Sequence, residues 1–326
     1  MVDYDMKLSV LALDGAFDTG LAVLLDTFSM ANELAIAQGR ERLPFEVKLI
    51  GVRPQIRTAL GLTASVESAG LVRNSDWIVV PALNAKTPPL LLEALARPDV
   101  LEAIDFLRAW RNRDIGIAGA CVGTFLLAEA GILDGVEATT TWSLSPLFRQ
   151  RFPAVRLDET QLIAGSDRVV TAGSMMGHLD LALWLVRQAS PEMAALVARF
   201  MLIDTRQSQA RYIIPDHLAH ADPLIERFDR WARDNLHRGF SLQEAASSLS
   251  VSARTLQRRS EAILGKSPLA FVQDIRVEEA QRLMSMGRNV ESIAAQVGYA
   301  DTATLRTLLR RRLGRGVREL KAEIRR

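Results

Sequence analysis

The segment Ile115-Gly-Ile-Ala-Gly-Ala-Cys-Val-Gly-Thr-Phe-Leu-Leu-Ala-Glu-Ala130 decides the fold class of this 326-residue chain. Its apolar start predicts a strand over residues 115–119, and the apolar spacing that follows predicts a helix over 122–130. A short turn that contains Cys121 and Gly123 joins the two. A strand that turns directly into a helix is the unit of open parallel sheets, so the segment predicts an α/β fold.

The same alternation continues on both sides of this segment. Residues 77–81 form an apolar run, which is typical of a strand buried on both faces. Further strands are expected over 7–13, 45–52, 161–164 and 168–172, and further helices over 21–37, 98–113, 177–188 and 191–203. We therefore predict a flavodoxin-like parallel sheet with flanking helices over residues 1–204.

The chain changes character after residue 204. Residues 205–222 are polar and rich in turn formers, so we expect a linker there, and residues 223–326 contain only short, well-capped helices. Residues 1–222 carry 20 bases and 26 acids, a net charge of −6, whereas 223–326 carry 20 bases and 12 acids, a net charge of +8. A basic helical tail fits either a nucleic-acid-binding module or a solvated surface.

Composition excludes several classes of protein. The hydrophobic fraction of 48% is that of a globular chain, not of a disordered or fibrous one. The single cysteine, Cys121, excludes a disulfide within the chain. The first residues are acidic where a signal peptide needs basic ones, and we expect no membrane-spanning segment. The chain is therefore expected in the cytoplasm.

The basic tail contains an internal repeat. In each copy a short helix, a tight turn and a second helix that ends at glycine follow one another, over 241–265 and again over 289–314. Ser241 with Glu244 forms a capping box, and Ser252, Asn289 and Asp301 are good N-cap residues. Ser267-Pro268 starts a connecting helix that runs to about Met286. Two such units predict a pair of helix-turn-helix motifs.

The second helix of each unit presents basic residues outward. Arginine pairs with guanine and glutamine with adenine in the major groove, whereas other arginines, here Arg311, Arg312, Arg315 and Arg318, suit phosphates. The alternative is a set of solvated arginines on ordinary amphipathic helices, but two copies at fixed spacing favour DNA binding. The residues expected to face DNA are Arg254, Gln257, Arg258, Thr302, Arg306, Thr307, Arg310 and Arg311.

The tail resembles the AraC/XylS family of transcription regulators over residues 223–320. The resemblance is carried by Ser252-Ala-Arg-Thr-Leu-Gln-Arg-Arg, Gly265-Lys-Ser-Pro-Leu-Ala-Phe-Val, Arg276-Val-Glu-Glu-Ala-Gln-Arg-Leu-Met and Ile293-Ala-Ala-Gln-Val-Gly-Tyr. It implies two recognition helices that enter successive major-groove segments. Ser260, Leu305 and Leu309 stand where the family usually has phenylalanine, and Thr307 replaces a frequent arginine. The second unit is thus expected to differ in packing or base readout.

Cys121 lies at the strand-to-helix turn. Such a turn projects a side chain into the crevice at the carboxyl end of the sheet, where open α/β sheets bind ligands. A helix N-terminus lowers the pKa of a thiol, so a nucleophilic cysteine is physically possible. The alternative is a small buried thiol, since free cysteine is among the most buried residues.

Residues 7–204 resemble the PfpI-type, class I glutamine amidotransferase-like domain. The matching stretches are 119–135, Ala138-Thr-Thr-Thr-Trp142 and Thr171-Ala-Gly-Ser with Asp180-Leu-Ala-Leu. Together with the AraC-type tail, this is the architecture of GlxA-type regulators. Thr141 stands where the enzymes often carry histidine, and Gly20 where they carry glutamate. The resemblance therefore implies a retired active site that binds a small molecule. The ligand-binding residues expected are Asp14, Gly15, Cys121, Val122, Gly123, Thr141 and Trp142.

These observations predict a transcription regulator, most simply an activator, and no enzyme. We expect double-stranded promoter DNA, RNA polymerase, a small-molecule effector and a second copy of the chain as partners, with no cofactor and no membrane. His217 and His220 form a weak candidate for a metal site, and none is expected. The alternative function is a cysteine-dependent PfpI-type hydrolase or amidotransferase-like enzyme with a regulatory tail.

Overall fold

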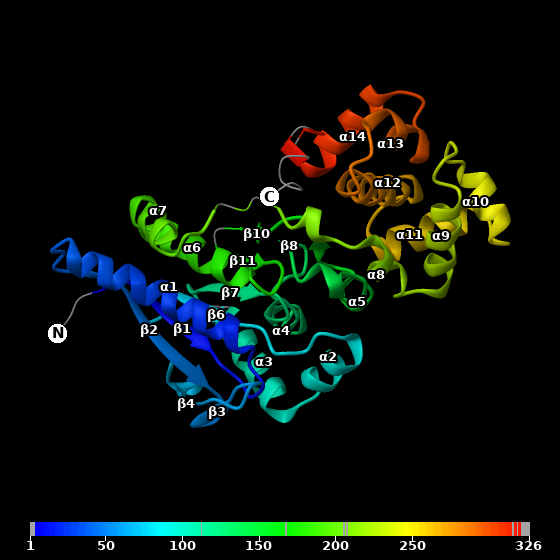
Figure 1. The fold of residues 1–326 in the computed structure, drawn as a ribbon. Coiled ribbons are helices and arrows are strands. Elements are labelled where there is room, and N and C mark those ends of the chain that lie inside the picture. The colour runs from blue at the N-terminus through cyan, green and yellow to red at the C-terminus, as the bar shows by residue number, and fades with distance from the viewer. Residues whose placement is uncertain are drawn as a thin grey trace. The chain divides into compact units, whose positions relative to one another are not determined.

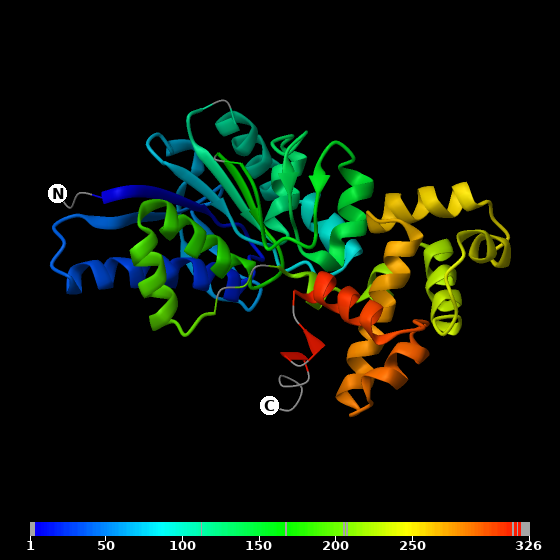
Figure 2. The same ribbon diagram turned by 90° about the horizontal axis from the view of Figure 1, so that it is seen from above.

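The structure is a computed structural model that describes residues 4–320 except 112, 167, 205, 207, 315 and 318. It divides into two compact units (Figures 1 and 2). The first unit holds the chain up to Leu144 and Phe152–Gln209, and the second holds Ser145–Arg151 and the chain from Ala210 onward. The polypeptide therefore passes from one unit to the other three times.

The first unit is built on a seven-stranded sheet with the order β10-β11-β7-β6-β1-β2-β5. Its strands are β1 (Tyr4–Leu11), β2 (Leu43–Gly51), β5 (Glu67–Ser68), β6 (Trp77–Val80), β7 (Gly116–Ala120), β10 (Ile163–Gly165) and β11 (Val169–Ala172). All neighbouring strands are parallel except β10, which pairs antiparallel with β11 at the edge. The predicted α/β class with a parallel sheet is thus confirmed.

Helices cover both faces of this sheet (Figures 1 and 2). On one side lie α1 (Asp18–Ala37), α6 (Gly177–Ala189) and α7 (Pro191–Phe200), and on the other α2 (Pro88–Leu95), α3 (Pro98–Arg111) and α4 (Gly123–Glu129). Leu24 and Phe28 of α1 join Val10 and Val79 of the strands in one hydrophobic core. The pairs β3 (Gln55–Arg57) with β4 (Thr63–Ser65), and β8 (Glu137–Ala138) with β9 (Arg156–Leu157), form two small sheets.

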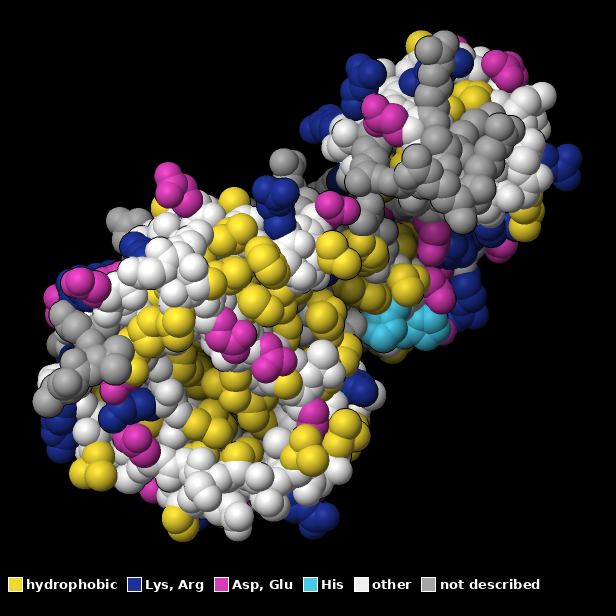
Figure 3. All heavy atoms as spheres, turned by 60° about the vertical axis from the view of Figure 1, so that its left-hand side comes forward, with side chains coloured by type: hydrophobic (Ala, Val, Ile, Leu, Met, Phe, Trp, Pro, Cys, Tyr) yellow, Lys and Arg dark blue, Asp and Glu magenta, His cyan; other side chains and the backbone are white. Residues whose placement is uncertain are grey.

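Helix α1 is long and apolar enough, by length and composition, to cross a membrane. In the structure its residues Leu24, Phe28, Ala31 and Ala35 are fully buried against the sheet and α6. A core helix passes the same test of length and composition, so this one gives no argument for a membrane span. Hydrophobic side chains nevertheless gather on the face of the first unit seen in Figure 3.

The second unit is helical throughout its described residues. Its main helices are α8 (Pro215–Ala219), α9 (Pro223–Asp234), α10 (Leu242–Ser248), α11 (Ala253–Leu264), α12 (Pro268–Ser285), α13 (Val290–Gln296) and α14 (Thr302–Leu313). The predicted caps are present, because Ser241, Ser252, Asn289 and Asp301 each accept a hydrogen bond from the third residue of the following helix. Two helix-turn-helix units, α10–α11 and α13–α14, are joined by α12.

Glycines end both second helices. Gly265 follows α11 with φ 66°, and Gly314 follows α14 with φ 69°. Both therefore adopt the left-handed conformation that glycine enters without steric cost. The helix ends fall where the repeat predicts them.

The stretch expected as a linker, 205–222, is more ordered than the sequence suggests. It carries a 3₁₀ turn, η3 (Ala210–Tyr212), and helix α8, in which Leu218 and Ala219 are buried. Asp222 caps α9 by accepting hydrogen bonds from Leu224 and Ile225, and it also pairs with Arg259 of α11. These contacts place residues from Ala210 onward in the helical unit.

Helix α5 (Ser145–Arg151) belongs to the same unit and packs against α11. Its Arg149 lies against Gly265, at the end of α11. The sequence pattern predicts neither α5 nor α2.

Candidate functional site

The turn between β7 and α4 has the geometry of a nucleophile elbow. Cys121 adopts φ 55°, a left-handed conformation that is uncommon for a residue with a side chain. Its N–H donates to the carbonyl of Ala172 over 2.8 Å, and the hydroxyl of Thr140 donates to its carbonyl over 2.7 Å. A side chain on Gly123 would overlap the carbonyl oxygen of Val80, so only glycine lets α4 start this close to β6.

The thiol at this elbow is not activated. Cys121 is only 4% exposed, and burial raises the pKa of its thiol to about 12. Hydrogen bonds from the Val122 N–H and from Thr141 offset this rise only in part. Because the thiolate is the nucleophile, a thiol that stays protonated at neutral pH cannot attack a substrate efficiently.

No histidine or carboxylate among the described residues is hydrogen-bonded to this thiol. The buried His178 accepts the Ala82 N–H at Nε2 over 3.0 Å, and its Nδ1 therefore donates to the carbonyl of Met175 over 2.7 Å. Burial lowers the pKa of His178 to about 4, so the ring is neutral at physiological pH. A Cβ on Gly20 would lie 2.7 Å from Nε2 of His178, which leaves no room for a glutamate there.

The ligand residues predicted from the sequence fall into two groups. Cys121, Val122, Gly123 and Thr141 are buried at the elbow, and Trp142 beside them is partly exposed. Asp14 and Gly15 instead line a hollow of about 520 Å³ with the turn of the β3–β4 hairpin. The structure thus joins Thr141 to the thiol but does not place Asp14 and Gly15 in the same described cavity.

Sequence reasoning missed the hairpin side of this hollow. Arg57 donates its N–H to the Asp14 carboxylate over 2.7 Å, and its carbonyl accepts the Gly15 N–H over 2.8 Å. Arg97 donates to the carbonyl of Asp14 over 2.7 Å. The Leu60 N–H donates to the Asp18 carboxylate over 3.0 Å. Gly61 was the one available signal of a turn, with φ 92°.

The recognition helices sort their residues as the amphipathic pattern predicts. Leu256 of α11 and Leu305 and Leu309 of α14 are fully buried. Basic side chains dot the outside of the helical unit (Figure 3). Five arginines on the two helices are exposed and have no recorded hydrogen bond or ion pair among the described residues: Arg254, Arg258, Arg306, Arg310 and Arg311.

The remaining predicted DNA-facing residues make local bonds. The Gln257 amide donates to the Glu261 carboxylate, so its N–H group is partly engaged within α11. The Thr307 hydroxyl donates to the Ala303 carbonyl over 3.0 Å. Thr302 is partly exposed at the start of α14.

One arginine expected to suit phosphates is instead structural. Arg312 lies 3.3 Å from the Asp274 carboxylate and donates to the side-chain oxygen of Gln273 over 3.1 Å. The reason is its place on the helix, because it faces α12 whereas Arg311 faces outward. Arg315 and Arg318 lie outside the described residues.

The positions where family phenylalanines are missing are well packed. Ser260 is buried and donates its hydroxyl to the Lys266 carbonyl over 2.7 Å. Leu305 and Leu309 pack in a core cluster with Ile293, Val297 and other residues of α12 and α13. Leucines therefore fill the second unit without the larger rings.

The two histidines of the weak metal candidate lie on or next to α8 and are exposed. His220 lies 3.8 Å from the Asp216 carboxylate and hydrogen-bonds the carbonyl of the same residue. Within the described part of the chain, no three His, Cys, Asp or Glu side chains come together as metal ligands would.

Comparisons with known proteins agree with both units. A family model described as a helix-turn-helix domain matches residues 245–323. The chain is 24% identical over 206 residues to the transcriptional regulator GbdR of Pseudomonas aeruginosa, which covers 62% of this chain and 56% of that protein. It is 26% identical to the regulator CdhR of the same species, over 72% of this chain and 70% of that protein. The chain spans little more than half the length of GbdR.

Solved structures match the first unit's fold. An AraC family transcriptional regulator from Pseudomonas putida gives a TM-score of 0.50 at 19% identity, over 60% of this chain and 99% of that one. A ThiJ/PfpI family protein from Pseudomonas syringae gives 0.50 at 19% identity, over 62% of this chain and 76% of that one. At such identity the likeness concerns the fold.

Proposed function

We propose that this chain, whose PfpI-like domain and AraC-type helix-turn-helix domain are those of GlxA-type regulators, binds promoter DNA and controls transcription. The observation that carries the proposal is the set of five exposed arginines without protein partners, Arg254, Arg258, Arg306, Arg310 and Arg311, on the second helices of two capped units. Arginine reads guanine bidentately or neutralises phosphate, and both uses need a free guanidinium group.

The arginines that hold the domain together support this assignment. Arg259, Arg276 and Arg312 each bond to a carboxylate or a carbonyl inside the helical unit. Their counterparts on the outward faces of α11 and α14 have no such partner among the described residues. A merely solvated surface gives no reason for this division of arginines along the same helices.

The first unit is proposed as the effector-binding domain. The hollow beside Asp14 and Gly15 and the retained elbow at Cys121 are its candidate binding features. A protonated thiol without a bonded base argues against a hydrolase. An effector acts by binding one arrangement of the protein more tightly than another.

Further parts of the proposal concern assembly and location. A homodimer would double the DNA contacts, because linking two modules raises their effective concentration on a paired site. The exposed Ile36, Phe200 and Leu202, on or next to the neighbouring helices α1 and α7, offer it an apolar surface. We assign the protein to the cytoplasm and expect contact with RNA polymerase and activation of transcription.

Selection of binding sites from a random DNA library with the full chain tests the proposal. The wild type should enrich a motif, and Arg306→Ala with Arg310→Ala should abolish the enrichment. Arg227→Ala removes the same charge from an exposed position on α9 and serves as the matched control. Equal enrichment by the double variant, or none by the wild type, would refute sequence-specific binding.

A further inference from the structure

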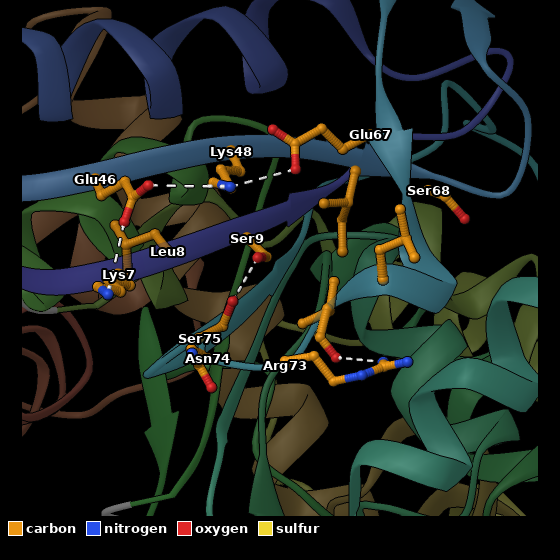
Figure 4. A pocket seen from close by; sticks show the side chains of 13 residues that line it. Lys7, Leu8, Ser9, Glu46, Lys48, Glu67, Ser68, Arg73, Asn74 and Ser75 are labelled. Carbon is orange, nitrogen blue, oxygen red and sulfur yellow. Dashed lines mark hydrogen bonds and ion pairs between the residues drawn. The ribbon is translucent and has the colours of Figure 1, made fainter.

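A second pocket lies over the sheet of the first unit, away from Cys121. Between β2 and β6 the chain passes through the β3–β4 hairpin, β5 and the 3₁₀ turn η1 (Ala69–Leu71), without an α-helix. Parallel strands are usually joined by a helix that packs on the sheet. Here a hollow of about 250 Å³ lies between β1, β2, β5 and residues 71–75. We call it the crossover pocket (Figure 4).

The strands carry polar residues on the side of this pocket. Lys7 and Ser9 of β1 and Glu46 and Lys48 of β2 line it, whereas alternate residues such as Val10 join the core on the other side. Strands of a covered parallel sheet are usually apolar on both faces. The polar face is therefore built for contact with water or with a polar ligand.

The charges of one wall are only loosely paired. Lys48 lies 3.4 Å from the Glu67 carboxylate and 4.0 Å from that of Glu46, and Lys7 lies 4.0 Å from Glu46. At these distances the ammonium groups keep most of their N–H donors available. Figure 4 shows these four side chains along β1, β2 and β5.

The opposite side of the pocket holds a cation without an acid. Arg73 donates from one terminal nitrogen to the carbonyls of Gly70 and Val72, over 2.8 and 3.1 Å. No carboxylate within the described residues pairs with it. A guanidinium group has five N–H donors, so most of those on Arg73 are unused.

The floor adds one more donor. The hydroxyls of Ser9 and Ser75 are 2.5 Å apart and share a single hydrogen bond. Two hydroxyls have two O–H donors, so one of them has no recorded partner in the described chain. Ser9 is only 2% exposed, which makes an unsatisfied donor there costly.

We propose that the crossover pocket binds a small molecule through a carboxylate or phosphate group. Three cations, Lys7, Lys48 and Arg73, face two carboxylates, Glu46 and Glu67, and donors outnumber acceptors. An oxyanion accepts several hydrogen bonds at once and would neutralise the excess positive charge. The site is distinct from the Cys121 elbow, and its existence does not depend on the proposed DNA binding.

Calorimetric titration of the full chain tests this site with two probes, inorganic phosphate and succinate. We expect one of them to bind with a Kd below about 1 mM. Arg73→Gln and Lys48→Gln should each weaken that binding at least about tenfold, because each removes a charge-assisted hydrogen bond. Arg40→Gln, an exposed arginine elsewhere on the same unit, should leave it unchanged.

The probe that binds identifies the chemistry, phosphate or carboxylate. Binding that persists in both pocket variants but disappears in Arg306→Ala would mean that the anion occupies the DNA-binding face, and would overturn the proposal. Absence of binding by either probe to the wild type would overturn it as well. Both pocket residues are exposed, so the variants should fold, and their circular dichroism spectra would verify this.

Discussion

Arg306 and Arg312 of helix α14 should respond to alanine substitution in opposite ways. Arg306 is exposed and has no recorded partner, whereas Arg312 contacts Asp274, Gln273 and the carbonyl of Ala270. Arg306→Ala should therefore change the free energy of unfolding by less than about 0.5 kcal/mol. It should weaken binding to the selected DNA by about 1–3 kcal/mol, or roughly 5- to 150-fold, if the residue reads a base.

Arg312→Ala should act first on stability. Its contacts are 3.1–3.3 Å long and its side chain is 31% exposed, so solvent screens the ion pair with Asp274. We expect a loss of about 1–2 kcal/mol, which lowers the Tm of the helical unit by roughly 4–8 °C. DNA affinity below the new Tm should fall less than it does for Arg306→Ala.

Calorimetry of the full chain and fluorescence anisotropy with labelled DNA measure the two quantities. The anisotropy titration is repeated at several salt concentrations and with a random duplex. Equal losses on selected and random DNA, with a salt slope smaller by about one, would make Arg306 a phosphate contact. A stability loss for Arg306→Ala as large as that for Arg312→Ala would refute the distinction between free and structural arginines.

Three further substitutions or titrations test the first unit. Gly123→Ala should destabilise it by about 1–3 kcal/mol in urea unfolding, because the new Cβ meets the Val80 carbonyl, while Gly70→Ala, which meets only ordinary contacts, should cost less; equal effects would contradict the packing of α4. Alkylation of Cys121 by iodoacetamide should be slow at pH 7 and accelerate about tenfold per pH unit toward a pKa of about 12; reaction at the rate of a free thiol would refute its burial. His178 has a pKa of about 4 in the fold against 6.5 in the unfolded chain, so the unfolded state binds more protons below pH 6.5, and stability should fall by up to about 3 kcal/mol between pH 6.5 and 4; the same pH dependence in His178→Gln would disprove this origin.

The architecture could be predicted from the sequence because it depends on local signals. The wholly apolar run at 77–81 became β6, and the caps Ser252 and Asp301 start α11 and α14. These signals need only hydrophobic periodicity and hydrogen bonds between near neighbours. The same reasoning gave helix ends at Gly265 and Gly314.

The site could be predicted only in part, because its partners come from distant segments. Nothing near Arg312 in the sequence indicates that Asp274 of α12 holds it, and the adjacent Arg311 has the same composition of neighbours. Arg57 reaches Asp14 through a hairpin that the period-two pattern is too short to reveal. The pKa of the Cys121 thiol likewise follows from burial, which overrides the helix N-terminus that sequence reasoning could see.

The threefold passage of the chain between the two units limits how the protein can be taken apart. A protease that cuts once after Gln209 leaves α5 covalently attached to the first fragment while it packs against α11 of the second. Gene truncation before Ala210 has the reciprocal effect, because it keeps α5 but removes the helix that α5 contacts. A stable fragment of either half therefore needs residues 145–151 to be reassigned, which makes this seven-residue helix the part to redesign before the halves are exchanged with those of other proteins.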